Sequence, residues 1–286
     1  MVKRIITVSF LLCTIFGLGK AQHNKLVTKE QLVIFGKSTT YVVLDENPMS
    51  EYNMGIKDAV EKYWKITPFK FISSREFDTK LKDPTASFIL RTKTFLSKDK
   101  NCSEYNYLNF LMGDKVTAIN DMPELLTIPL SYAGVEIDTY SNKLGIFIKF
   151  AQEHIKNLQA GSRPSEINNL KYYNKNIRDI KGKTLLVQAE DLSEEVNTLE
   201  KIKAQYPYDV KIVSSEEIEK AIAGQTANTI ILHQISPSPK DRVGRSYKII
   251  YGVDDSKMYY YNFENISQKR PAGILAKDFK RITFDW

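Results

Sequence analysis

The sequence predicts an α/β protein built from two tandem copies of one small unit, each a mixed sheet with helices packed on it. Its 286 residues exceed the length at which a single hydrophobic core usually stops growing. The segment SSREFDTKLKDPTASFIL, residues 73–90, also aligns without a gap on SSEEIEKAIAGQTANTII, residues 214–231. A repeat at this spacing indicates a duplicated domain, so we expect each half to fold around its own core.

The amino terminus has the pattern of a cleaved signal peptide. Lys3 and Arg4 precede the apolar run 5–18, and small residues stand at the expected cleavage point near Ala21. The bulky residues before Cys13 disfavour a lipoprotein signal. We therefore expect residues 1–21 to be removed and the mature protein to be exported, periplasmic or extracellular, with no transmembrane segment.

The predicted first unit, residues 22–160, follows a βαβαββ order with a helix at its end. Its expected strands are 39–44, 69–72, 86–95 and a fourth that includes Tyr105 and Tyr107. Ser50 is positioned to cap the helix after the first strand, and Ser73 with Glu76 forms a capping box for the next. Apolar residues at helical spacing from Leu144 to Leu158 predict the closing helix.

The predicted second unit, residues 182–286, repeats this order after a polar linker at 161–181. Its expected strands are 184–189, 210–213, 229–235, 247–251 and 258–263. One helix is expected from Leu192 to Tyr206, and Ser214 with Glu217 repeats the capping box. The sequence GVDDSK between the last two strands is a hairpin signal.

Charge and cysteine content narrow the classes of partner and chemistry. The 41 basic and 34 acidic residues give a net charge of +7 and are spread along the chain, which does not favour nucleic acid as a partner. Cys102 is the one cysteine beyond the predicted signal peptide, so neither an internal disulfide nor a CxxC redox motif is expected.

Two glycine-containing motifs resemble the end of a phosphate-binding loop. GKST at 36–39 and GKT at 182–184 lack the required earlier glycine, because Gln31 and Ile177 stand there, and both lead into strands instead of opening helices. We interpret them as turns.

No metal or cofactor site is expected. His23, His154 and His233 have no second ligand at metal spacing. Asp254 and Asp255 suit the tip of a hairpin better than a calcium loop, since a lysine follows closely.

Two sets of residues are candidates for a binding or catalytic site. Tyrosines stand on the late strands of both units, and strand alternation would turn some of them outward as a binding surface: Tyr105, Tyr107, Tyr259, Tyr260 and Tyr261. Acids also follow the first strands, one in the first unit and two in the second, at the edge where open α/β sheets bind ligands: Asp45, Glu190 and Asp191.

The order of strand, helix, short strand ending in ISSREF or IVSSEEI, short helix and the strand ASFILRTK resembles the TolB amino-terminal domain and the CsgG class of envelope proteins. The resemblance covers about 60 residues in each unit. It implies a role in envelope assembly or protein contact and carries over no catalytic residues. The signal peptide ending in KAQ is also similar to those of exported Bacteroidetes proteins.

The leading hypothesis is a non-catalytic exported module that binds another envelope protein or a polysaccharide through strand edges, loops or tyrosine-bearing faces. The alternative is an enzyme whose site lies in the cleft between the units, with Asp45 and Glu190 or Asp191 as its acids.

Overall fold

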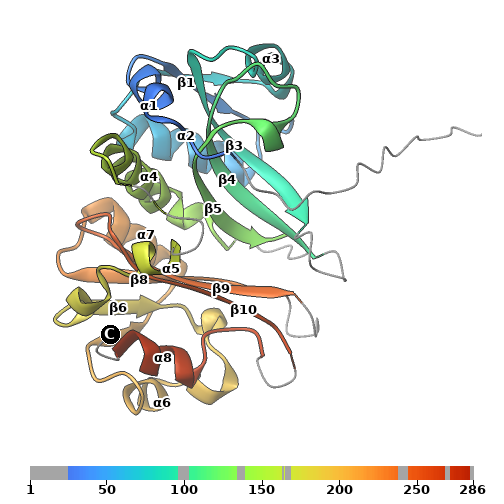
Figure 1. The fold of residues 1–286 in the computed structure, drawn as a ribbon. Coiled ribbons are helices and arrows are strands. Elements are labelled where there is room, and N and C mark those ends of the chain that lie inside the picture. Colours follow the sequence, from blue (N-terminus) through green and yellow to red (C-terminus); the bar gives the residue numbers. More distant parts are fainter. Residues whose placement is uncertain are drawn as a thin grey trace, which may run out of the picture.

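The computed structural model describes residues 25–95, 103–133, 139–162, 164, 169–237, 244–267 and 271–283. It contains two mixed five-stranded sheets with helices packed on them, which confirms the predicted fold class (Figure 1). The predicted signal peptide, His23 and Cys102 lie outside the described residues. Among the described residues, no helix is long and apolar enough to cross a membrane.

The first unit forms a sheet with the order β2-β1-β3-β4-β5. Its elements are α1 (Lys29–Phe35), β1 (Thr39–Val43), α2 (Glu51–Tyr63), β2 (Phe69–Ile72), α3 (Ser74–Lys80), β3 (Ala86–Phe95), β4 (Glu104–Met112), η1 (Ile119–Asp121), β5 (Glu124–Tyr132), η2 (Ser141–Lys143) and α4 (Leu144–Gln159). Strand β1 runs parallel to both β2 and β3, while β4 and β5 are antiparallel additions.

The second unit forms a sheet with the matching order β10-β9-β8-β6-β7. Its elements are α5 (Asn169–Tyr173), η3 (Ile177–Ile180), β6 (Thr184–Val187), η4 (Ala189–Asp191), η5 (Glu194–Val196), α6 (Leu199–Lys203), β7 (Val210–Ile212), α7 (Ser215–Gly224), β8 (Thr229–Ile235), β9 (Arg245–Gly252), β10 (Met258–Asn265) and α8 (Ala276–Thr283). Helices α3 and α7 are therefore equivalent, as are α2 and α6, and α4 and α8.

The repeated capping boxes start equivalent helices, as predicted. Ser73 and Glu76 bond each other's backbone N–H at the start of α3, and Ser214 and Glu217 do the same at the start of α7. Each box satisfies two amide donors that a helix amino terminus leaves without partners. Ser50 likewise caps α2, as predicted.

The expectation of one core for each half is wrong, because the largest core runs through both units. It joins the face of the first sheet covered by α2 and α4 to the face of the second sheet covered by α7 (Figure 1). Two smaller cores lie on the outer faces, one under α3 and the other under α6 and α8. The units thus meet through faces that are not equivalent, which is a heterologous contact.

Helix α4 carries much of this contact. The rings of Phe147 and His233 lie 4.8 Å apart, and those of Phe150 and Tyr251 lie 5.2 Å apart, so α4 of the first unit packs aromatic side chains onto the second sheet. Such ring pairs contribute beyond the apolar area that they bury.

Gly145 allows α4 to approach both α2 and α7, which leads to a prediction for stability. A Cβ at this position would lie 2.8 Å from Tyr63 Cε2 and 3.3 Å from Ile222 Cγ2. We expect Gly145→Ala to lower the free energy of unfolding by about 1–3 kcal/mol because it overpacks the junction. Gly224→Ala is the matched control: its Cβ would meet only Thr226 Oγ1, at 3.9 Å, and it should be neutral or stabilising. Urea denaturation of both variants tests this, and equal effects would contradict it.

Two sequence expectations about elements need correction. Strand β5 was not expected, and the predicted βαβαββ order of the first unit therefore lacks it. The helix expected from Leu192 to Tyr206 is broken into η5 and the short α6. Leu192 instead forms a β-bridge with Ile274, and Ser193 N–H donates to the Ile274 carbonyl at 3.2 Å. Pairing with the segment around Ile274 therefore keeps the first residues of the expected helix extended.

The predicted linker packs onto the second sheet. The side-chain amide of Asn174 both donates to Tyr261 O and accepts from Tyr261 N–H on β10, at 2.9 and 2.7 Å. Asn176 donates to Met258 O at 2.9 Å. These bonds satisfy backbone groups on the outer edge of β10, which would otherwise be open to pairing with another strand.

Candidate functional site

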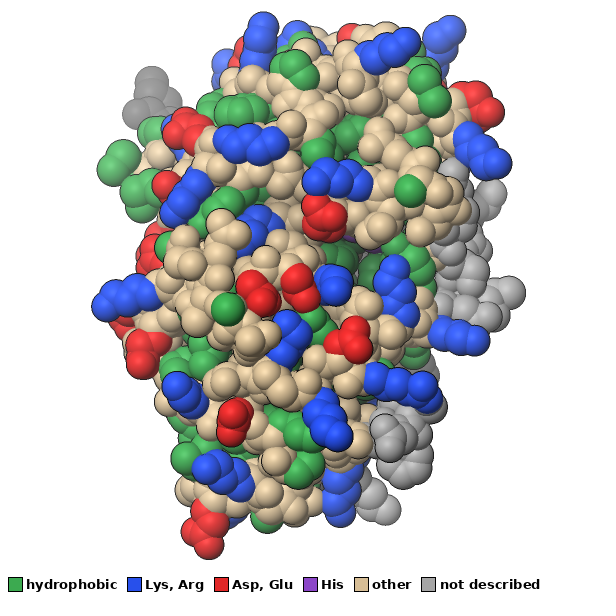
Figure 2. Space-filling view, turned by 90° about the vertical axis from the view of Figure 1, so that its left-hand side faces the viewer, with side chains coloured by type: hydrophobic (Ala, Val, Ile, Leu, Met, Phe, Trp, Pro, Cys, Tyr) green, Lys and Arg blue, Asp and Glu red, His purple; other side chains and the backbone are tan. Residues whose placement is uncertain are grey.

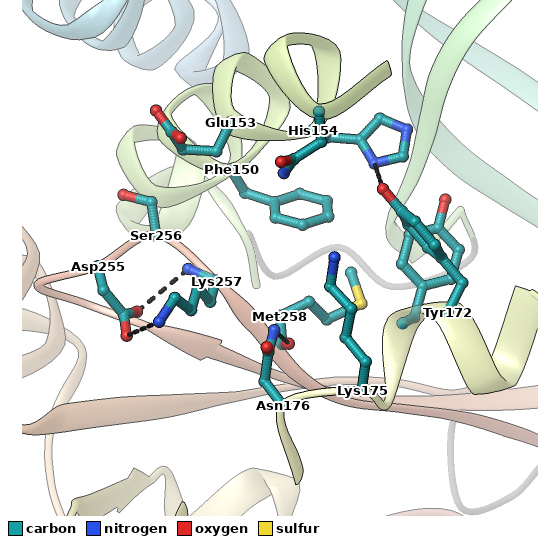
Figure 3. Close-up of a pocket in the computed structure, with 12 residues that line it drawn as sticks. Phe150, Glu153, His154, Tyr172, Lys175, Asn176, Asp255, Ser256, Lys257 and Met258 are labelled. Carbon is teal, nitrogen blue, oxygen red and sulfur yellow. Dashed lines mark hydrogen bonds and ion pairs between the residues drawn. The ribbon is translucent and has the colours of Figure 1, made fainter. Parts of the chain in front are cut away.

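A pocket of about 240 Å³ lies at the junction of the two units. Its walls come from α4, from α5 and the residues after it, and from the turn between β9 and β10 (Figure 3). The side of the molecule drawn in Figure 2 is hollowed near its middle, where apolar side chains are visible between charged side chains of both signs. We call the pocket between the two units the junction pocket.

Four residues of α4 line the junction pocket because they share one face of the helix. They are Phe150, Glu153, His154 and Asn157. Spacings of three, four and seven residues place side chains above one another on a helix. The sequence prediction of this helix rested on other, apolar positions between Leu144 and Leu158 and did not group these four residues.

His154 is a buried, neutral ring that lines the pocket. Burial lowers its pKa to about 4, against a weaker opposite effect of a backbone hydrogen bond at Leu125. Its ring stacks on Tyr173 with 5.9 Å between centroids, and its Nδ1 lies 3.5 Å from the Tyr172 hydroxyl. A histidine with so low a pKa is a weak base near neutral pH.

The charges at the pocket are unequally paired. Glu153 accepts from Lys156 at 2.7 Å, and Asp255 lies 3.7 Å from Lys257 and 3.6 Å from Lys183. Lys175 Nζ lies 4.8 Å from the Tyr172 ring centroid, and no described carboxylate is within ion-pair distance of it. Within the described part of the chain, Lys175 is therefore a cation of the pocket without an acidic partner.

As predicted, Asp254 and Asp255 lie in the hairpin turn, between β9 and β10. Asp255 Oδ1 accepts from Lys257 N–H at 3.2 Å, the Tyr259 hydroxyl donates to Asp255 Oδ2, and Lys183 lies 3.5 Å from Asp254 Oδ1. Across the described residues, no group of three His, Cys, Asp or Glu side chains is placed to hold a metal ion. The GKST and GKT motifs form turns that lead into β1 and β6.

A second hollow, of about 630 Å³, lies at the carboxyl ends of β1 and β2 and holds the predicted candidate Asp45. Asp45 Oδ2 lies 2.5 Å from Arg91 Nη2, and Arg91 Nη1 donates to the Tyr140 hydroxyl at 2.9 Å. Asp45 is thus held by a cation from β3. We call this the β1–β2 hollow.

The other two predicted acids lie in the second unit. Glu190 is exposed and accepts from Gln188 Nε2 at 2.9 Å. Asp191 is buried and lies 3.8 Å from Nζ of Lys143, a buried residue of the first unit. Burial raises the pKa of Asp191 to about 6, although Lys143 opposes the shift. None of Asp45, Glu190 and Asp191 lines the junction pocket.

The five tyrosines that were expected to form a binding surface pack in the cores instead. Tyr105 and Tyr107 are buried between the units, where the Tyr107 and Tyr247 hydroxyls lie 2.9 Å apart. Tyr259 and Tyr260 both enter the core under α8, and Tyr261 packs on the shared core. The β-bulge between Met258 and Tyr260 breaks the strand alternation on which the expectation relied.

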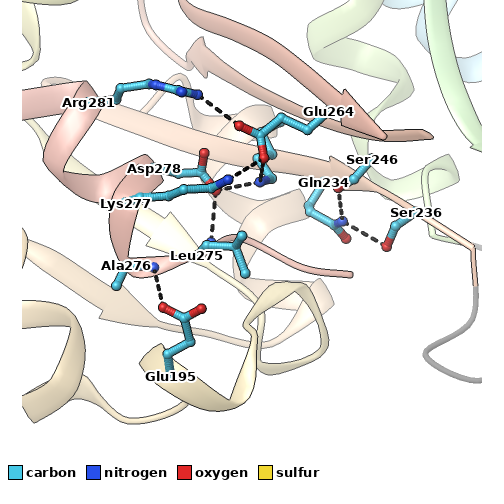
Figure 4. Close-up of polar contacts among 11 residues, drawn as sticks. Glu195, Gln234, Ser236, Ser246, Glu264, Leu275, Ala276, Lys277, Asp278 and Arg281 are labelled. Carbon is cyan, nitrogen blue, oxygen red and sulfur yellow. Dashed lines mark hydrogen bonds and ion pairs between the residues drawn. The ribbon is translucent and has the colours of Figure 1, made fainter. Parts of the chain in front are cut away.

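The outer face of the second unit contains a buried charge cluster (Figure 4). Lys248 of β9 forms an ion pair with Asp278 of α8, and both side chains are almost fully buried. Asp278 also accepts from Leu275 N–H at 2.9 Å. Glu264 of β10 binds Lys277 at 2.6 Å and lies 4.0 Å from Lys248. These contacts fix α8 on the sheet.

Sequence reasoning missed the junction pocket for a definable reason. Lys175 and Asn176 lie in the segment that was interpreted as a linker, and only the fold brings them against α4. No family model, curated protein or solved structure matches this chain.

Proposed function

We propose that this protein is a non-catalytic binding module of the cell envelope that holds an acidic sugar residue of a polysaccharide in the junction pocket. The observation that carries the proposal is the combination, in one pocket, of aromatic rings with amide groups and a lysine, Lys175, that forms no ion pair with any described carboxylate. Such pockets bind ligands through apolar walls and a few polar groups that fix orientation.

Aromatic walls favour a ligand with an apolar face. Phe150, Tyr172 and Met258 line the pocket (Figure 3), and Tyr173 lines it as well. The C–H groups on one face of a pyranose ring form such an apolar face, while its hydroxyl groups remain at the edge. Burial of that face on the rings would supply the nonspecific part of the affinity.

Polar groups around the rings favour hydroxyl and carboxylate groups at the edge of the ligand. Asn157, Asn176 and Ser256 line the pocket and can bond hydroxyl groups. Lys175 can donate a charge-assisted hydrogen bond to a carboxylate, which is stronger than a neutral one. A sugar with an acidic substituent, such as a uronic acid, uses both kinds of group.

The state of the titratable groups supports binding over catalysis. Glu153 and Asp255 are engaged with lysines, and the low pKa of His154 makes it a weak base. The pocket lies between the units, where the enzyme alternative located its site, but the acids assigned to that alternative lie elsewhere. Export and the envelope location rest on the signal-peptide pattern.

Calorimetry with acidic and neutral oligosaccharides tests the proposal. We expect uronic-acid oligomers to bind and their neutral counterparts to bind at least tenfold more weakly. Lys175→Met should weaken binding of the acidic oligomers about tenfold or more, since a hydrogen bond to a charged group contributes roughly 1.5–3 kcal/mol. Lys181→Met, at an exposed position outside the pocket, is the control.

Three results would count against this function. Equal binding by Lys175→Met and the unchanged chain would show that the oligosaccharide does not bind through Lys175 in the junction pocket. Failure of every acidic oligosaccharide to bind would rule out acidic sugars as the ligand. Shortened oligosaccharides after incubation, detected by chromatography, would favour the enzyme alternative.

A further inference from the structure

The geometry points to a second binding site: we propose that the β1–β2 hollow takes a helix-initiating turn of a partner protein that presents one basic side chain. This site is separate from the junction pocket and does not depend on saccharide binding. The argument comes from the second unit, in which the equivalent place is already occupied.

In the second unit, the turn before α4 occupies the place that corresponds to the β1–β2 hollow. Asn142 Nδ2 donates to the carbonyl of Ser215, the first residue of α7, at 3.4 Å. The next residue, Lys143, is buried and reaches Asp191 at 3.8 Å. A turn from one unit is thus held by a helix start and an acid of the other.

The strand register identifies the equivalent residues in the first unit. Val42 pairs with Phe71 in the first sheet as Val187 pairs with Ile212 in the second. Counting onward from these pairs, Ser74 stands where Ser215 stands. By the same count, Glu46 stands where Asp191 stands.

The equivalent residues line a hollow that is open. Ser74 and Glu46 both line the β1–β2 hollow, and no described residue fills it as Asn142 and Lys143 fill its counterpart. Leu44 and Phe71 provide apolar lining for the rest of a turn. The first unit therefore has an open hollow of the kind that receives a turn in the second unit. The turn that fills the place in the second unit, before α4, comes from the first unit.

Charge at the hollow favours a single basic residue. Glu46 is exposed and forms no ion pair with any described residue, whereas Asp45 is held by Arg91. Lys57 and Arg75 also line the hollow, so a strongly basic segment would be repelled. One lysine or arginine, placed as Lys143 is placed, would reach Glu46.

A second copy of this chain fits less well than a different protein. Lys143 of each copy is already buried between its own units. The equivalent turn before α8, residues 271–275, reads PAGIL and has no basic residue. The occupant we propose is thus a partner with its own turn of this kind.

A peptide of residues 139–146, TYSNKLGI, serves as the probe because it carries the turn that fills the counterpart. Binding to the full chain is followed by NMR. We expect shifts at Glu46 and Ser74, and at least tenfold weaker binding when the lysine of the peptide is replaced by alanine. Glu46→Lys in the protein should weaken binding to the same extent, while Glu219→Lys, at an exposed position on α7, should not.

The outcomes separate this proposal from the saccharide proposal. Glu46→Lys should keep saccharide binding, and Lys175→Met should keep peptide binding. Peptide affinity that Glu46→Lys leaves unchanged would overturn the inference. Concentration-dependent dimers in analytical ultracentrifugation that Glu46→Lys abolishes would also overturn it, because they would make a second copy the occupant.

Discussion

Replacement of Lys248 by methionine should lower the free energy of unfolding by about 3–5 kcal/mol. The lysine and Asp278 are only 1% and 0% exposed, so the change would leave a buried carboxylate without its cation. Removal of one partner of a buried ion pair is strongly destabilising, because the remaining charge keeps its desolvation penalty. Urea denaturation at pH 7 measures the effect.

A double variant shows whether the loss comes from the orphaned charge. In Lys248→Met/Asp278→Asn, both charges are gone and the asparagine can still accept from Leu275 N–H. We expect it to be more stable than Lys248→Met alone. Lys280→Met, at an exposed position of the same helix, should change stability by no more than about 0.5 kcal/mol. A double variant no more stable than the single one would contradict the ion-pair explanation.

Acidification should destabilise the protein through His154. Its pKa is about 4 in the fold and near 6.5 in the unfolded chain, so the unfolded state binds more protons between these values. The free energy of unfolding therefore falls as the pH drops from 6.5, and the loss is complete below about pH 4. The shift corresponds to about 3 kcal/mol.

Comparison with His154→Phe isolates this contribution. The phenylalanine keeps a ring beside Tyr173 and removes the titration, so the unchanged chain should lose about 3 kcal/mol more than the variant between pH 7 and 4. Asp191, with a raised pKa, acts in the opposite direction, and His233, with a lowered one, acts in the same direction. Both are present in the two proteins and cancel in the difference. Parallel pH profiles would contradict the assignment.

Local signals were sufficient for most of the fold. The capping boxes at Ser73 and Ser214 depend on residues three positions apart, and the structure forms both as predicted. Strands β2 and β3 have the expected bounds, because β-branched and aromatic runs between turn residues depend little on distant contacts.

Features that depend on distant contacts were not predictable in this way. The helix expected from Leu192 is prevented by pairing with Ile274, which lies far away in the sequence. The prediction of a tyrosine surface was wrong because a β-bulge changes which side chains face inward. The alternation of side chains along one strand does not reveal where a bulge occurs. The junction pocket combines α4 with a supposed linker, so its residues become neighbours only in the folded chain.

The heterologous contact between the units also gives each copy its own place in the molecule. Lys80 is half-buried, with its ammonium over the Tyr41 ring, whereas Ala221 occupies the matching position of α7 and is buried against the first unit. If the first unit took the place of the second in the molecule, the α3 face, with this lysine, would be pressed into the middle and the α7 face would be exposed to water. Each copy has thus become specialised for its own place, and the two are no longer interchangeable parts.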